Sequence, residues 1–179
     1  GLKPVYDGKL LVDVLSLSVW SMLHAFISVA PWFLFFVAVE HLGKTELAIS
    51  NITRSVSAVF FVIVNSFAVT TGSLVSNAIG AGERRAVFII CRKILRLGYS
   101  AGFPLIGVAV CYNRLIIGIY TDNELLTEQA FIPFVVTLLN YTFALPGYVY
   151  LNAVGGTGKT RITFLFQVTT TVVYLGYLY

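Results

Sequence analysis

An uncharged segment from Ser55 to Ile79 constrains the fold of this chain more than any other feature. A helix needs about 20 apolar residues to cross the hydrocarbon core of a bilayer, and this segment is long enough. It also contains amide and hydroxyl side chains, including Asn65 and Thr70. Lipid offers such side chains no hydrogen-bond partner, so we expect one face of this helix to line a cavity or to contact another helix.

The composition extends this interpretation to the whole chain. Of its 179 residues, 58% are hydrophobic and 11% are charged, whereas soluble domains carry about 25% charged residues. The fold class is therefore an all-α polytopic membrane protein, and we expect no enzyme. The spacing of Cys91 and Cys111 fits no metal motif, so both are interpreted as packing residues and no metal is expected. Short basic loops supply the net charge of +4, which favours membrane lipids over nucleic acid as partners.

Five transmembrane helices are predicted. The fourth contains Asn140, Tyr141 and Tyr148 but no acidic or basic residue, and Pro146-Gly147 is expected to break it. Interrupted helices with polar side chains at depth are where transporters place their binding sites. The predicted spans are approximately residues 14–39, 50–79, 97–120, 130–154 and 162–179.

Three ionisable side chains in or beside the first two spans each have two interpretations. Glu40 ends the first span and Arg54 lies near the start of the second, so we expect them at one membrane level, where they can form an ion pair. A surface arginine that extends its charge to the interface is the alternative. His24 is either a proton-linked group or a histidine that is hydrogen-bonded within the bundle.

Basic residues set the expected orientation. Nine of the 12 Lys and Arg residues lie in one alternate set of loops, so the N-terminus is predicted to be cytoplasmic. Residues 83–96 have a basic face and are predicted to form a helix lying at the membrane interface. The turn GGTGKTR at 155–161 does not predict nucleotide binding, because Ala153 stands where the phosphate-binding loop requires its first glycine.

Three runs of sequence resemble the multidrug and toxic compound extrusion (MATE) family. They are VEHLGKTELAISNITRS, LVSNAIGAGERR and YLNAVGGTGKTR. The resemblance implies helices seven to ten and most of eleven of a twelve-helix fold. The chain would then be the second lobe of a two-lobe transporter, truncated at its C-terminus. Residues 1–13 would be a cytoplasmic linker between the lobes, residues 14–179 would form the helix bundle, and the missing N-terminal lobe would be its partner.

The resemblance also implies a function. Family members are secondary antiporters that export organic, often cationic, compounds in exchange for sodium ions or protons, without a cofactor. The expected location is the bacterial inner membrane. The span interiors here contain no Asp or Glu, so the coupling ion stays open between sodium and proton. We expect the following side chains to line the substrate cavity, with the aromatic ones attracting cations: Asn65, Thr70, Asn140, Tyr141 and Tyr148.

Two alternative functions keep a membrane location. A flippase for lipid-linked precursors, from a related branch of the superfamily, requires a basic cavity to hold pyrophosphate, and the span interiors lack Lys and Arg. A membrane scaffold that transports nothing predicts that the polar side chains pair among themselves and leave no water-filled cleft.

Overall fold

The structure is a computed structural model that describes residues 8–41, 43–121 and 123–178. Within these residues the chain forms helices joined by short turns, and no strand occurs. The predicted all-α fold class is therefore confirmed. The helices are α1 (Gly8–Glu40), α2 (Lys44–Gly80), α3 (Ala86–Cys111), α4 (Asn113–Gly118), α5 (Glu124–Leu139), α6 (Tyr141–Gly156) and α7 (Thr160–Leu178).

Four segments of the described chain are long and apolar enough to cross a membrane. Three of them lie in α1, α2 and α3, and the fourth, Glu124–Gly156, combines α5 and α6. The 19 residues of α7 are not among these candidates, so the fifth span stays a prediction. Left-handed glycines, Gly82 with φ 83° and Gly158 with φ 80°, form the turns after α2 and α6. Residues with a Cβ rarely adopt this conformation.

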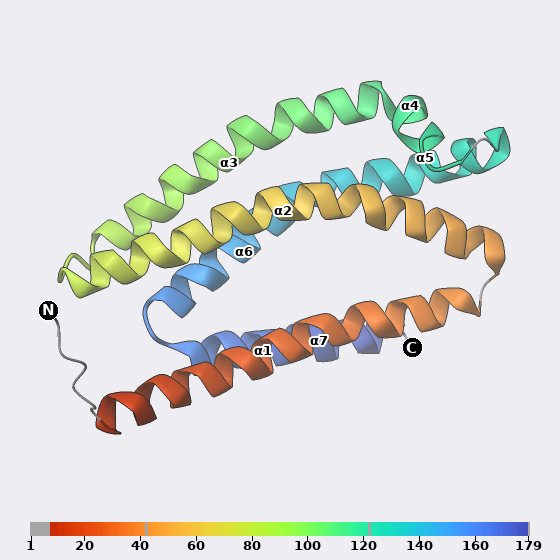
Figure 1. Cartoon of the computed structure of the whole chain (residues 1–179). Helices are drawn as coiled ribbons and strands as arrows, with labels where there is room; N and C mark the ends of the chain where they lie inside the picture. Colours follow the sequence, from red (N-terminus) through yellow and green to blue (C-terminus); the bar gives the residue numbers. More distant parts are fainter. Residues whose placement is uncertain (1–7, 42, 122, 179) are drawn as a thin grey trace, which may run out of the picture.

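The helices form two groups (Figure 1). In the first, α1 and α7 run side by side in the same direction, and we call them the α1–α7 pair. The Trp20 ring meets Phe164 edge-on with 5.2 Å between ring centroids, and the Arg161 guanidinium lies 5.3 Å from the Trp20 centroid. In the second, which we call the α2 group, α2 packs against α3, α5 and α6. The two groups contact each other where α1 meets α2 and where α6 meets α7, less extensively than α1 contacts α7 or α2 contacts α6.

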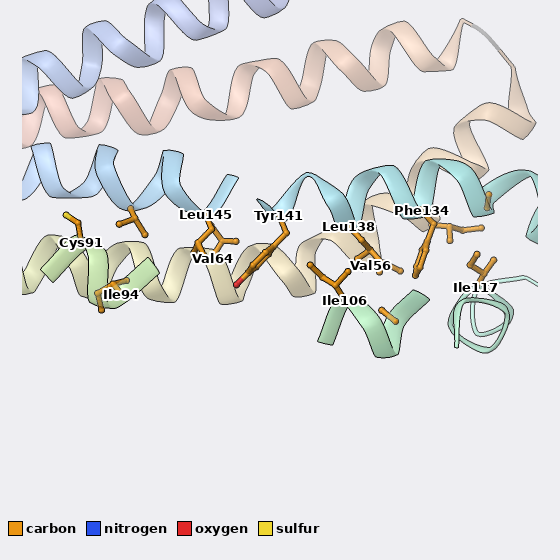
Figure 2. Close-up of a cluster of buried hydrophobic side chains, with 14 of the residues drawn as sticks. Val56, Val64, Cys91, Ile94, Ile106, Ile117, Phe134, Leu138, Tyr141 and Leu145 are labelled. Carbon is orange, nitrogen blue, oxygen red and sulfur yellow. The ribbon is translucent and has the colours of Figure 1, made fainter. Parts of the chain in front are cut away.

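The hydrophobic core belongs to the α2 group (Figure 2). Phe134, Leu138 and Leu145 are almost completely buried and face α2 and α3. Cys91 is buried in the same cluster, as expected, but Cys111 is exposed, so its interpretation as a packing residue is wrong. The large apolar side chains of α1 are mostly exposed, which suits a helix whose outer face contacts lipid.

Several predicted boundaries differ from the structure. The predicted third span, residues 97–120, is interrupted, because α3 ends at Cys111 and α4 begins at Asn113. Residues 83–96 do not form a separate interfacial helix, because α3 runs unbroken from Ala86 to Cys111 and contains most of them. The basic face is simply the first part of that helix. Further, α2 begins at Lys44, six residues before the predicted start of the second span. Charged residues that looked like a loop in the sequence therefore belong to the first turns of α2.

Candidate functional site: a cleft between the two helix groups

A cleft of about 1020 Å³ lies between the α1–α7 pair and the α2 group. It is lined on one side by α1 and α7 and on the other by α2, α5 and α6, with Asn140 at the junction of the last two. Its aromatic lining comes from Trp32 and Phe35 of α1, Tyr148 of α6 and Tyr174 of α7. A cleft of this size, with apolar walls and a few polar groups, is typical of small-molecule sites.

The polar side chains of α2 that reach the cleft follow from helical spacing. Glu46, Ser50, Arg54 and Ser57 are separated by four, four and three residues and all line the cleft. Positions spaced in this way share one face of a helix. The Arg54 guanidinium lies 5.0 Å from the centroid of the Phe36 ring, a cation–π geometry that joins α2 to α1.

The junction between α5 and α6 differs from the predicted break at Pro146-Gly147. The helix α6 runs through Pro146 to Gly156, and the interruption falls at Asn140 instead. A proline removes the hydrogen bond to the carbonyl four residues earlier, which here is that of Thr142. The Tyr99 hydroxyl of α3 donates to this carbonyl at 2.8 Å. The neighbouring helix thus supplies the missing donor, and α6 needs no break.

Two of the five predicted cavity residues, Asn140 and Tyr148, line the cleft. Tyr141 does not, because its side chain is 3% exposed and its hydroxyl donates to the Gly98 carbonyl of α3 at 2.8 Å. Asn65 is on the Arg54 face of α2 but about 16 Å further along the axis. Thr70 is about 160° around the helix from Arg54, and its hydroxyl donates to its own helix at Ser66.

The predicted ion pair between Glu40 and Arg54 is absent from the described structure, which is a correction with a geometric cause. Because α2 begins at Lys44, Arg54 is about 15 Å along the helix from its start. Glu40 ends α1 beside the connecting turn. Arg54 instead reaches Phe36, one turn back from Glu40 on α1.

Sequence reasoning missed the contribution of α7. Gln167, Thr170, Thr171 and Tyr174 line the cleft at helical spacings of three, one and three residues. That spacing was a signal available in the sequence, since such positions share a face. Thr171 is only 9% exposed, and its Oγ1 has no hydrogen-bond partner among the described residues.

His24 is half-buried, and its Nε2 atom is enclosed by the protein. Its Nε2 makes no hydrogen bond within the part of the chain that the structure describes. The interpretation as a histidine hydrogen-bonded within the bundle is thus not supported for this atom. The proton-linked role stays a prediction, and His24 is not among the residues that line the cleft.

Helices of membrane length arranged around a cleft of aromatic and polar side chains have the architecture of an integral membrane transport protein. A family model, MatE, matches residues 21–179, and the chain belongs to this family of transporters. The resemblance found in the sequence is therefore confirmed. No curated protein and no solved structure matches the chain.

Proposed function

We propose that this chain is part of a secondary active exporter of organic compounds, driven by antiport with sodium ions or protons. The observation that supports this proposal is the cleft between the α1–α7 pair and the α2 group. Its aromatic faces suit planar organic compounds, including cations, through stacking and cation–π attraction of roughly 0.5–2 kcal/mol per contact. In this proposal the N-terminal lobe is the partner and the N-terminus is cytoplasmic in a bacterial inner membrane.

The substrate site proposed here lies within this chain. The sequence suggested only that the chain forms one wall of a cavity shared with another lobe. The cleft instead has both walls in the described residues, one from α1 and α7 and the other from α2, α5 and α6. The contacts between the groups, α1 with α2 and α6 with α7, are less extensive than those of α1 with α7 or of α2 with α6, so in this proposal the two groups shift relative to each other. Such a shift is a means of changing access to the cleft.

The two alternative functions fit this cleft less well. A pyrophosphate-binding flippase needs several cations, but among the described lining residues the charged side chains are Glu46 and Arg54 alone. A scaffold predicts that polar side chains within the bundle are paired. The amides of Asn140 and Gln167 line the cleft, and Thr171 Oγ1 has no hydrogen-bond partner in the part of the chain that the structure describes, which favours a site that receives a ligand.

Efflux from proteoliposomes tests this proposal. Proteoliposomes that contain the full-length protein are loaded with a fluorescent organic cation, the methyl ester of a rhodamine. Efflux is measured under a sodium gradient, a proton gradient or neither. We expect efflux with one of the two gradients only. Ser57→Phe places a ring in the cleft and should lower that efflux at least about tenfold. Ser66→Phe makes the same change at an exposed position of α2 outside the cleft and should leave it unchanged. Gradient-independent efflux, or equal effects of both variants, would contradict the proposal.

A further inference from the structure

Arg54 is the only cationic side chain among the described residues that line the cleft. No carboxylate of the described chain forms an ion pair with it, and the central carbon of its guanidinium lies over the Phe36 ring, 5.0 Å from the centroid. A guanidinium stacked on an aromatic ring keeps its N–H donors at its edge. No hydrogen bond from the Arg54 guanidinium occurs among the described residues, so its donors can bind a group that enters the cleft.

Glu46, the other charged residue of the cleft, does not neutralise Arg54. It is eight residues earlier on α2, which is about 12 Å along the axis. Its carboxylate turns toward the start of its own helix, where a Cβ at Gly43 would be 2.6 Å from its Oε2. A helix N-terminus favours a negative charge. The charge of Glu46 is thus accommodated locally, and that of Arg54 remains available.

Other polar side chains of the cleft add further donors, from the α5–α6 junction on the same wall as Arg54 and from α7 on the opposite wall. Asn140 and Gln167 each bear an amide NH₂ group, and neither has a side-chain hydrogen bond in the described structure. Thr171 Oγ1 is buried and makes no hydrogen bond with any described residue. Amides and hydroxyls can also accept hydrogen bonds, but a guanidinium can only donate. A carboxylate matches this set, because it only accepts hydrogen bonds and pairs with arginine through two parallel ones.

We propose that the cleft selects aromatic compounds that carry a carboxylate, with Arg54 as the residue that recognises the carboxylate. The ring system of the compound stacks against Trp32, Tyr148 or Tyr174, and the carboxylate reaches the guanidinium edge. A positive charge elsewhere on the compound is compatible with these aromatic walls. This inference rests on the proposed function, because it takes the cleft as the substrate site.

A matched pair of dyes tests the inference. A rhodamine with a free benzoate and its methyl ester share one cationic ring system and differ only at the carboxylate. Binding of each dye to the purified full-length protein in lipid nanodiscs is measured by fluorescence anisotropy. We expect the wild type to bind the free acid at least about tenfold more tightly than the ester, which corresponds to about 1.4 kcal/mol. Arg54→Gln should abolish this preference by weakening the free acid alone, and Arg54→Lys should retain part of it.

Arg114→Gln is the matched control, since it removes an exposed arginine outside the cleft and should preserve the preference. Two results would overturn the inference alone: both dyes bind the wild type equally, or Arg54→Gln keeps the wild-type ratio. Transport through the cleft would then still stand. If neither dye binds, both this inference and the proposed substrate site fail.

Discussion

The hydroxyl of Tyr141 on α6 donates a hydrogen bond to the carbonyl oxygen of Gly98 on α3, 2.8 Å away. The Tyr141 ring lies against Gly102, one turn further along α3, and would overlap a Cβ built there. One aromatic side chain therefore joins the two helices through both a hydrogen bond and a close approach. Small residues permit such approaches between membrane helices.

Gly102→Ala should destabilise the protein, because the added methyl group has no space beside the Tyr141 ring. Overpacking of this kind costs about 1–3 kcal/mol. Gly107→Ala is the control on the same helix, where a Cβ meets nothing within 4 Å. That substitution should be neutral or stabilising, since alanine favours helix by about 1 kcal/mol over glycine. Thermal unfolding of the detergent-solubilised protein measures both, and equal midpoints for the two variants would contradict this packing.

Asn140→Leu should lower efflux about threefold to tenfold. It removes a polar group from the cleft wall and with it one hydrogen bond to the substrate. The amount of folded protein should not change. The neighbouring substitution Tyr141→Phe should lower stability and not efflux. It removes the bond to Gly98 at a cost of about 0.5–1.5 kcal/mol in stability and leaves efflux intact. The idea fails if Tyr141→Phe is the variant with impaired efflux.

Gly156→Ala should weaken the contact between α6 and α2. A Cβ at Gly156 would be 2.5 Å from the backbone oxygen of Gly72, which cannot move aside as a side chain can. The Ser76 hydroxyl also donates to the Gly156 carbonyl at 2.9 Å, so the same shift breaks a hydrogen bond. Gly155→Ala is the control, because its nearest neighbour would be Thr163 Oγ1 at 3.8 Å. We expect the unfolding midpoint to fall clearly for Gly156→Ala only; a comparable fall in both would point to the turn itself.

Arg54 should be coupled to Phe36 and not to Glu40. A double-mutant cycle with Arg54→Gln and Phe36→Leu should give a coupling free energy of about 0.5–1 kcal/mol, the range of exposed cation–π pairs. The cycle with Glu40→Gln should give a value near zero, since no ion pair joins the two described residues. Unfolding free energies of the single and double variants provide the measurement. If Glu40→Gln rescues the stability lost in Arg54→Gln, the result would instead support the ion pair that the sequence suggested.

Much of the fold was predictable because lipid imposes a strong pattern on sequence. The long uncharged segments identified the helices of membrane length, and the glycine turns marked the ends of α2 and α6. Helix starts were less predictable. Lys44 and Glu46 look like loop residues because they are charged, yet α2 extends past the apolar segment and includes them.

The cleft was predictable only in part. Asn140 and Tyr148 were identified because they are polar groups inside an apolar span, and both line the cleft. Tyr141 has the same sequence signal, but its side chain is buried against α3, where its hydroxyl donates to the Gly98 carbonyl. The α7 residues were missed because their role depends on the pairing of α7 with α1. That pairing joins segments far apart in the chain, and no local pattern specifies it.

The pairing of α1 with α7 also determines the order in which this protein can assemble. All of α2 to α6 separates the two helices, and a ribosome adds about 5–20 residues per second. The first helix is therefore in the bilayer several seconds before the helix that covers its inner face has been made. During that interval Trp20 lacks Phe164 and Arg161, while the hydrogen bonds of α2, α3 and α6 can already form. The cleft is consequently among the last parts of the molecule to exist, and binding of any compound there reports that synthesis has reached α7.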